Sequence, residues 1–145
     1  MTTPTLDRQV ESRLGEHNVR YTRGRRAVIE ALLSSDGPKS AAELDGSLSD
    51  LPLSSLYRTL GVLESAGVVA PHHGSRGVTR YEIADWLRGH HHHVVCIDCG
   101  AVEDIEIPER DERLLDEVIG AAAKSVAFEP VDHSLEIVVR CSNCS

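Results

Sequence analysis

The sequence predicts an α+β protein with an N-terminal winged helix-turn-helix domain and a small C-terminal α/β domain. Amphipathic helical segments come first, and two strands around a Gly-rich tip follow them. The second half combines three strands with one long helix. Two Cys-x-x-Cys pairs lie in that second half, one near its start and one at its end. We expect a winged-helix domain at residues 1–83, a hinge at 84–89 and a dimerisation and metal-binding domain at 90–145.

Apolar spacing and a capping residue predict the first two helices. Residues 6–17 carry an apolar side chain at every fourth position, which indicates a short amphipathic helix. Thr22 is a suitable N-cap for a second helix that reaches Leu33, because its hydroxyl can accept a hydrogen bond from the first turn. The polar segment 34–38 ends that helix.

The third and fourth helices are also marked by local signals. Ser40-Ala-Ala-Glu43 matches the capping-box pattern that opens a helix. Asp50-Leu-Pro52 interrupts the chain, and Ser54 or Ser55 is then expected to cap the fourth helix. That helix ends near Ala66-Gly67, since glycine favours the left-handed conformation that closes many helices.

Two strands, at about 68–71 and 78–83, follow the fourth helix and enclose a Gly-rich tip at 72–77. This order is typical of a winged helix-turn-helix, with the fourth helix as the recognition helix. A small helical scaffold with ordinary surface arginines is the alternative. Polar and cationic side chains near the starts of the second and fourth helices are the candidate contacts to phosphates and base edges. They are Arg23, Arg25, Ser55, Tyr57, Arg58 and Thr59.

The second half reads as three strands and one long helix. Strands are expected at about 91–96, 101–107 and 135–140, and Pro108 can start a helix that runs towards Ala123. Such a small unit buries little apolar surface by itself. We therefore expect it to complete its core by pairing with a second copy, as a homodimer.

The four cysteines, Cys96, Cys99, Cys141 and Cys144, are predicted to hold one structural zinc ion. They are all the cysteines in the chain, and two intervening residues in each pair let one turn present both sulfurs to the same ion. Two disulfides or two redox-active pairs are the alternatives. Cys-x-x-Cys in the cytoplasm, where thiols stay reduced, usually binds metal.

Composition and charge set further limits. The chain has 145 residues, no apolar run long enough to span a membrane, and a polar start without the apolar stretch of a secretion signal, so we expect a cytoplasmic protein. The net charge is −8. Residues 1–81 carry 10 basic and 9 acidic side chains, whereas residues 82–145 carry 5 and 14. An acidic chain argues against nucleic-acid binding, but the asymmetry weakens this objection. The acidic excess lies in the half that holds the candidate metal ligands, where bound cations would offset part of it.

Four consecutive histidines, His90 to His93, run into the first cysteine pair. In a strand, successive side chains point to opposite faces, so His91 and His93 share one face while His90 and His92 share the other. One run can therefore supply ligands to two metal sites. An expression tag is one alternative, although tags are terminal and this run is internal; a solvated polar strip is another.

Taken together, these motifs resemble the ferric uptake regulator (Fur) family. The resemblance covers roughly residues 6–145 and rests on four segments: Ser55-Leu-Tyr-Arg-Thr-Leu60, Leu63-Glu-Ser-Ala-Gly-Val-Val69, His90-His-His-His-Val-Val-Cys-Ile-Asp-Cys-Gly100 and Cys141-Ser-Asn-Cys144. It implies a homodimeric, metal-dependent transcriptional repressor with no small organic substrate. It also implies that regulatory metal closes the dimer so that both winged helices reach a palindromic operator in double-stranded DNA.

The resemblance further implies three sets of metal ligands and two DNA contacts. The cysteines correspond to a structural zinc site, and Tyr57 and Arg58 fall at positions that contact DNA. A regulatory site corresponds to Glu82, His91, His93 and Asp104. An accessory site corresponds to His90, His92, Asp116 and His133. Asp111 or Glu112 are alternatives to Asp116, because the segment before the long helix is longer than usual.

One departure from the family pattern bears on the effector. Iron and peroxide sensors usually carry a histidine just before the third helix, where this chain has Pro38 or Lys39. Zinc sensors often carry an extra cysteine ahead of the histidine run, which this chain lacks, and the nickel-sensor spacing of hinge histidines is not matched by His72 and His73. The missing ligand comes from His72, His73 or His17, or the site is built without it. In the absence of a metal role, these three would be ordinary surface or wing-tip residues.

We therefore expect iron(II) or zinc as the sensed metal, with manganese, nickel or peroxide sensing as alternatives in the same family. A metal-buffering protein is the alternative from another class, but it leaves the arginine-bearing recognition helix unexplained. An enzyme is not expected, because the sequence shows no general base or nucleophile placed beside the metal ligands.

Overall fold

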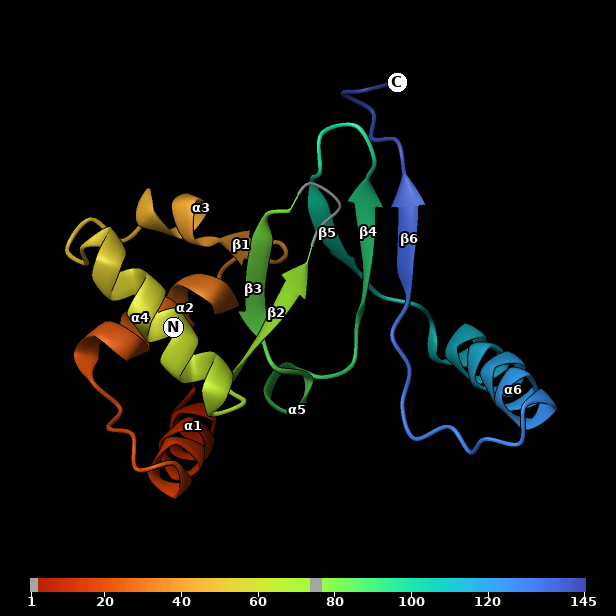
Figure 1. Ribbon diagram of the computed structural model, residues 1–145, viewed down its shortest axis with the longest axis horizontal. Coiled ribbons are helices and arrows are strands. Elements are labelled where there is room, and N and C mark those ends of the chain that lie inside the picture. The colour runs from red at the N-terminus through yellow and green to blue at the C-terminus, as the bar shows by residue number, and fades with distance from the viewer. Residues whose placement is uncertain (1–2, 74–76) are drawn as a thin grey trace.

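The structure, a computed structural model, describes residues 3–73 and 77–145 and contains two three-stranded sheets with helices around them (Figure 1). Residues 74–76 of the expected hairpin tip lie outside the described part. The elements in chain order are α1 (Pro4–Glu16), α2 (Arg23–Leu33), β1 (Lys39–Ser40), α3 (Ala41–Asp45), α4 (Leu53–Ser65), β2 (Val69–His73), β3 (Thr79–Ile83), α5 (Asp85–Arg88), β4 (His92–Cys96), β5 (Val102–Ile105), α6 (Glu109–Ser125) and β6 (Glu136–Val139). No helix in the described ranges combines the length and apolarity needed to cross a bilayer.

Two of the predicted helix caps are confirmed. The hydroxyl of Thr22 accepts a hydrogen bond of 3.3 Å from the backbone N–H of Arg25 at the start of α2. The hydroxyl of Ser40 accepts one of 3.2 Å from the N–H of Glu43 at the start of α3. Both caps follow from sequence because the groups involved are only three residues apart.

The predicted cap of α4 is wrong. The N-cap is Pro52, no side chain caps the helix, and Ser54 and Ser55 lie inside the first turn. Pro52 has an extended conformation, with φ of −57° and ψ of 145°. It both ends the preceding segment and directly precedes the helix. The recognition helix therefore begins earlier than the serines suggest.

One hydrophobic core fills the N-terminal half. Its buried side chains come from α1, α2, α3, α4, β2 and β3, from Val10 to Ile83. The sheet has the order β1-β3-β2, and all its pairs are antiparallel. The two-residue strand β1 was not predicted, because a segment this short carries no alternation. Helices packed on a small sheet with a hairpin make this half the expected winged helix.

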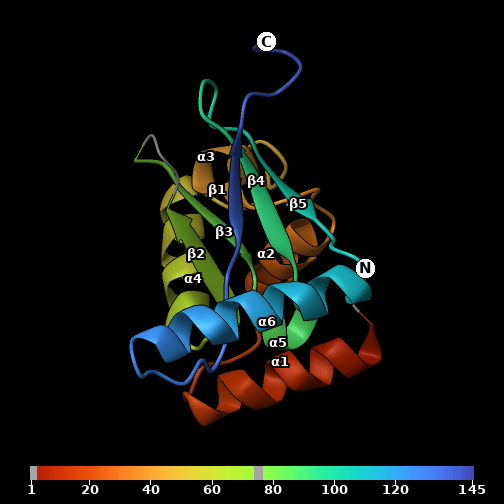
Figure 2. The same ribbon diagram turned by 90° about the vertical axis from the view of Figure 1, so that its right-hand side faces the viewer.

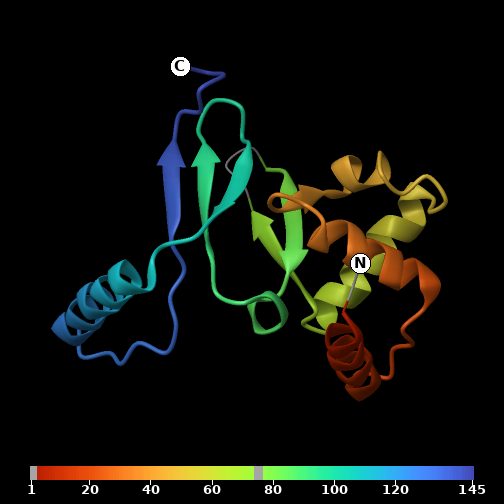
Figure 3. The same ribbon diagram turned by 180° about the vertical axis from the view of Figure 1, so that it is seen from behind.

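The C-terminal half is much less buried. Its sheet has the order β5-β4-β6, with β4 antiparallel to β5 and parallel to β6. In residues 90–145, all of which the structure describes, the buried apolar side chains are Val95, Cys96 and Val102. Helix α6 has no buried residue and lies beyond the sheet, away from the winged helix (Figures 1 and 3). Figure 2 shows it crossing in front of the lower ends of the strands.

The segment expected to be a simple link contains a short helix, α5. Trp86 Nε1 donates a hydrogen bond of 2.7 Å to the carbonyl of Gly67, and the guanidinium of Arg13 lies 4.2 Å from the centre of the Trp86 ring. Leu87 packs against the winged-helix core. Helix α5 is therefore attached to the N-terminal half.

A second contact joins the two halves at Gly37. A Cβ atom at Gly37 would lie 2.8 Å from the carbonyl oxygen of Val102 in β5, too close for any other residue type without movement. Nearby, the backbone N–H of Asp104 points to the carbonyl of Asp36 at 3.4 Å. The loop before β1 thus rests directly on the C-terminal sheet.

Candidate metal centres

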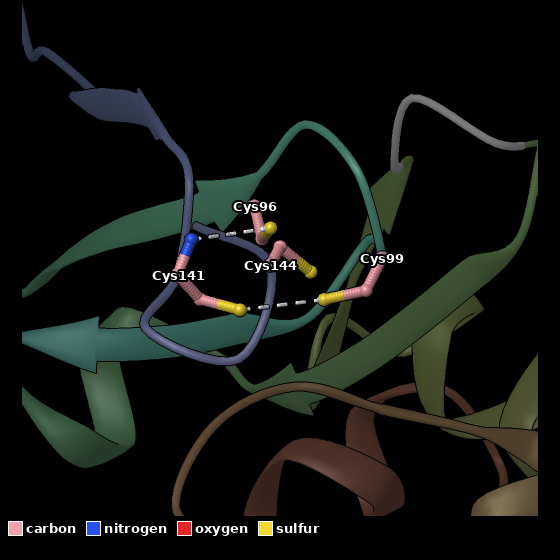
Figure 4. A group of neighbouring side chains, drawn as sticks. All are labelled: Cys96, Cys99, Cys141 and Cys144. Carbon is pink, nitrogen blue, oxygen red and sulfur yellow. Dashed lines mark hydrogen bonds between the residues drawn. The ribbon is translucent and has the colours of Figure 1, made fainter.

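The four cysteines converge at one end of the C-terminal sheet (Figure 4). Cys96 ends β4, Cys99 lies in the turn before β5, and Cys141 and Cys144 lie in the turn after β6. The Sγ atoms of Cys99 and Cys141 are 3.8 Å apart, and the N–H of Cys141 donates to Cys96 Sγ at 3.4 Å. All four sulfurs lie within 4.8 Å of one another.

This spacing suits one tetrahedral ion. Sulfurs about 2.3 Å from zinc are about 3.8 Å apart at tetrahedral angles, whereas a disulfide needs about 2.05 Å. Backbone N–H groups, first that of Cys99, lower the pKa of Cys96 to about 6, while hydrogen bonding with Cys141 raises the pKa of Cys144 to about 12. Cys144 thus resists ionisation by itself, and a dication would supply the positive charge that stabilises its thiolate.

A second cluster lies where the winged helix meets the C-terminal sheet. Glu82 comes from β3, His93 from β4, Asp104 from β5, and His91 directly precedes β4. Glu82 Oε2 lies 2.9 Å from His91 Nε2 and 2.8 Å from His93 Nε2. Asp104 Oδ1 lies 3.6 and 3.3 Å from the same two nitrogens. We name this group the hinge cluster.

The hinge cluster has the dimensions of a coordination sphere. Ligand atoms about 2.1 Å from a common ion are about 3.0 Å apart at right angles and about 3.4 Å apart at tetrahedral angles. His91 Nδ1 lies 3.1 Å from the carbonyl of Gly89, which accepts its proton and leaves Nε2 free to face the cluster. Gly89 has φ of 99°, a conformation that favours glycine, so the turn before β4 helps to orient His91.

The electrostatics of the hinge cluster also favour a bound cation. Burial acts to raise the pKa of Glu82, but hydrogen bonds with His93 and His91 outweigh it and lower that pKa. Burial acts to lower the pKa of His91, but its hydrogen bond with Glu82 outweighs it and raises that pKa. Burial raises the pKa of Asp104 despite the nearby Arg88. Positive charge is thus favoured where His91 and His93 face Glu82, the position that a metal ion would take.

A third cluster lies on the other face of β4. His90 Nε2 is 3.2 Å from His133 Nε2, and His92 Nε2 is 3.0 Å from Glu112 Oε2. Glu112 Oε1 lies 2.8 Å from His133 Nε2 and 3.1 Å from His90 Nε2. The strand alternation predicted for His90 to His93 is therefore confirmed, with each pair facing a different cluster.

The carboxylate in this third cluster is Glu112, the alternative, and Asp116 is not within it. Asp116 Oδ1 lies 3.3 Å from Nδ1 of His133, the ring nitrogen that faces away from the cluster. The two acids are one helical turn apart on α6 and share a face, so sequence spacing alone cannot choose between them. Asp111 is not part of the cluster either.

The position of the missing family histidine contributes no side-chain ligand. Pro38 is buried, and Lys39 pairs with Glu43 at 4.0 Å. His17 is the exposed C-cap of α1, and His73 lies at the end of β2. His72 is the nearest candidate: its ring centre is 4.8 Å from that of His93, and its Nε2 is 3.1 Å from Glu136 Oε2. It lines a cavity of about 340 Å³ together with Glu82, His91 and His93, but none of its atoms is among the ligand atoms of the hinge cluster.

The candidate DNA contacts lie on the outer side of the winged helix. Tyr57 and Arg58 are exposed on α4, and Ser55 and Thr59 on the same helix are partly buried. Arg23 is exposed at the start of α2, whereas Arg25 is partly buried and donates to the carbonyl of Arg20. The described residues thus offer an accessible polar and cationic surface near the N-terminal ends of α2 and α4.

Two charged residues beside the hinge cluster had no sequence signal. Arg88 Nη2 in α5 lies 3.1 Å from Asp104 Oδ2. Asp85, also in α5, lies 3.5 Å from His91 Nδ1. Neither contact could be inferred from spacing, because the short helix that positions both residues was not predicted.

Comparison with known proteins gives consistent matches over nearly the whole chain. A model of the ferric uptake regulator family matches residues 16–138. The ferric uptake regulation protein of Bacillus subtilis is 30% identical over 97% of this chain and 94% of its own length. The peroxide operon regulator of the same organism is 30% identical over 91% of this chain and 88% of its own. The solved structure of the Helicobacter pylori ferric uptake regulator, described as having three functional metal binding sites, superposes with a TM-score of 0.76 at 25% identity, covering 99% of this chain and 94% of that one.

Proposed function

Because this chain belongs to the ferric uptake regulator family, and is therefore a metal-responsive transcriptional regulator and not an enzyme, we propose that a divalent cation at the hinge cluster controls its binding to DNA. The observation that carries the proposal is the origin of the ligands. Glu82 belongs to β3 of the winged helix, whereas His91, His93 and Asp104 belong to the C-terminal half.

The proposed switch works through the orientation of the winged helix. A cation bound by all four side chains would tie β3 to β4 and β5 and favour one arrangement of the two halves. Coupling of this kind typically shifts a conformational equilibrium by about 1–3 kcal/mol per site. Two sites in a dimer would act together, so DNA affinity could change by orders of magnitude.

The sensed metal is proposed to be iron(II) or zinc. The hinge cluster offers two imidazoles and two carboxylates and no thiolate, a set that also accepts manganese(II) and nickel(II). The two Bacillus subtilis relatives, a ferric uptake regulator and a peroxide regulator, are equally similar at 30% identity, so overall similarity does not choose between iron and peroxide signals.

The other two clusters are assigned separate roles. We assign the four cysteines to structural zinc and the set of His90, His92, Glu112 and His133 to an accessory metal. Asp116 would then accept a hydrogen bond from the outer nitrogen of His133 and orient its ring. A cysteine site needs reduced thiols, which supports the expectation of a cytoplasmic protein.

The functional assembly is proposed to be a homodimer on a palindromic operator in double-stranded DNA. We propose the domain limits 1–83 for the winged helix, 84–89 for the hinge and 90–145 for the dimerisation and metal-binding domain. The exposed apolar side chains of the C-terminal half support pairing with a second copy: Leu114 is 56% exposed, Val118 65% and Val138 62%. Arg23, Arg25, Ser55, Tyr57, Arg58 and Thr59 are proposed to contact the DNA.

The test compares two carboxylate substitutions, Glu82→Gln and Glu103→Gln. Both remove one negative charge, but Glu103 is an exposed residue of β5 outside every cluster. Binding to a duplex from the protein's own promoter would be measured by fluorescence anisotropy over a range of buffered free metal. We expect Glu103→Gln to follow the wild type and Glu82→Gln to need far more metal. Equal metal dependence of all three proteins would refute the switch.

The salt dependence of DNA binding distinguishes a regulator from a metal-buffering protein. A regulator that contacts several phosphates shows a steep fall of DNA affinity with salt, because bound counterions are released. A buffering protein would bind the same metals without saturable binding to the duplex.

A further inference from the structure

The hinge cluster already has a cation beside it, the guanidinium of Arg88. Its Nη2 atom lies 3.1 Å from Oδ2 of Asp104, while Oδ1 of the same carboxylate faces the Nε2 atoms of His93 and His91. Asp104 thus stands between the arginine and the two histidines. Its side chain is 15% exposed and that of Arg88 is 26% exposed, so water screens the pair only in part.

The contact neutralises charge without good hydrogen bonding. Neither carboxylate oxygen of Asp104 has a hydrogen-bond partner of suitable geometry among the described residues, and the same holds for Nη1 of Arg88. A bidentate arginine–carboxylate pair would satisfy these atoms and be difficult to separate. The observed pair is therefore held mainly by charge and can be exchanged for a stronger cation.

A charge count shows why both cations are unfavourable together. Glu82 and Asp104 supply two negative charges, which a divalent ion balances by itself. Arg88 cannot lose its proton at any physiological pH, so its charge stays unless the side chain moves away. A bound divalent ion and an adjacent guanidinium would leave one excess positive charge on this set of groups. Asp85, 3.5 Å from His91 Nδ1, offsets that charge only weakly, because its side chain is 53% exposed and water screens it.

From this geometry we propose that Arg88 is a resident counter-cation of the hinge cluster, which divalent metal must displace from Asp104. Arg88 thereby sets how much metal is needed to occupy the site. The proposal deepens the proposed function, because it takes the hinge cluster to be the regulatory site.

Displacement of Arg88 would also change how the DNA-binding half is held to the C-terminal sheet. Arg88 is the last residue of the four-residue helix α5, whose Trp86 is hydrogen-bonded to Gly67 and covered by Arg13. Arg88 holds this helix to β5 through Asp104, so its release removes one of the links between α5 and the C-terminal sheet. Metal binding would thus exchange an α5–β5 contact for a direct β3–β4–β5 contact.

The test measures Mn²⁺ affinity from the electron paramagnetic resonance signal of the free ion. All proteins carry Glu112→Gln, which weakens the accessory cluster, and zinc at the cysteines. We expect Arg88→Met and Arg88→Gln to bind Mn²⁺ about tenfold more tightly than the parent, since removal of one nearby positive charge favours a dication. Lys124→Met, which removes an equal charge from an exposed position on α6, should leave the affinity unchanged.

A double-mutant cycle with Asp104→Asn then isolates the pair. Without the Asp104 charge, Arg88→Met should change Mn²⁺ affinity much less than it does in the parent. Unchanged or weaker Mn²⁺ binding by the folded Arg88 variants would overturn the proposal. The site itself is tested separately with His91→Ala: if that change leaves Mn²⁺ binding intact, the proposed regulatory site fails, whatever Arg88 does.

Discussion

Replacement of Cys141 by serine should unfold the C-terminal half and leave the winged helix folded. The apolar side chains buried in residues 90–145 are Val95, Cys96 and Val102. Each contributes at most about 3 kcal/mol, whereas a structural zinc ion contributes about 10–16 kcal/mol in small zinc domains at neutral pH. Within one chain the sheet β5-β4-β6 therefore depends on zinc, and a ligand set reduced to three thiolates should bind zinc too weakly to keep it.

The assay combines zinc analysis with thermal unfolding. Wild type should contain about one tightly held zinc per chain and unfold with contributions from both halves. Cys141→Ser should lose the zinc and the unfolding signal of the C-terminal half, while the winged helix, which has its own core, still unfolds cooperatively. Ser142→Ala is the matched control, since Ser142 is an exposed residue in the same turn.

Retention of both halves of the unfolding transition by zinc-free Cys141→Ser would refute the dependence of the C-terminal sheet on zinc. That result would mean that the C-terminal sheet is held by apolar packing against a second copy of the chain and not by the four sulfurs. Retention of zinc by Cys141→Ser would instead contradict the assignment of Cys141 as a necessary ligand.

Three further outcomes follow from the structure. Arg58→Ala, on the exposed side of α4, should weaken operator binding and reduce the slope of log K against log salt by about 1, as measured by anisotropy titrations; an unchanged slope would remove Arg58 from the phosphate contacts. Metal affinity at the hinge cluster should fall as pH drops through the raised pKa of His91, because the protonated imidazole cannot bind metal. Mn²⁺ titrations at several pH values check this, and an affinity that does not change with pH would contradict it. Val118→Asp, at a position 65% exposed on α6, should convert a dimer to a monomer in sedimentation velocity runs, and an intact dimer would place the interface elsewhere.

Local sequence signals predicted much of the fold. The caps at Thr22 and Ser40 were correct because each involves groups three residues apart. The fourth helix was placed too late because Pro52 starts it without a side-chain cap. Helix α5 was missed because what holds it is distant in sequence, namely the contact of Trp86 with Gly67.

The clusters show the same division between local and distant information. Strand alternation correctly separated His91 and His93 from His90 and His92, since a period of two is a local property. The choice of Glu112 over Asp116 depends on where α6 lies against β4, which spacing along the helix does not specify. The contact of Arg88 with Asp104 depends on both α5 and the packing of the two halves, so no sequence pattern indicated it.

The most direct test of the central claim compares His91→Ala with His90→Ala, two neighbouring histidines on opposite faces of one strand. Operator affinity would be measured for both variants and the wild type across the same series of free metal concentrations. We expect His91→Ala to lose most of the metal dependence, because it removes a ligand of the hinge cluster. His90→Ala should keep it, since that side chain faces Glu112 and His133. Equal loss in both variants, or a metal response that survives in His91→Ala, would contradict control of DNA binding from the hinge cluster.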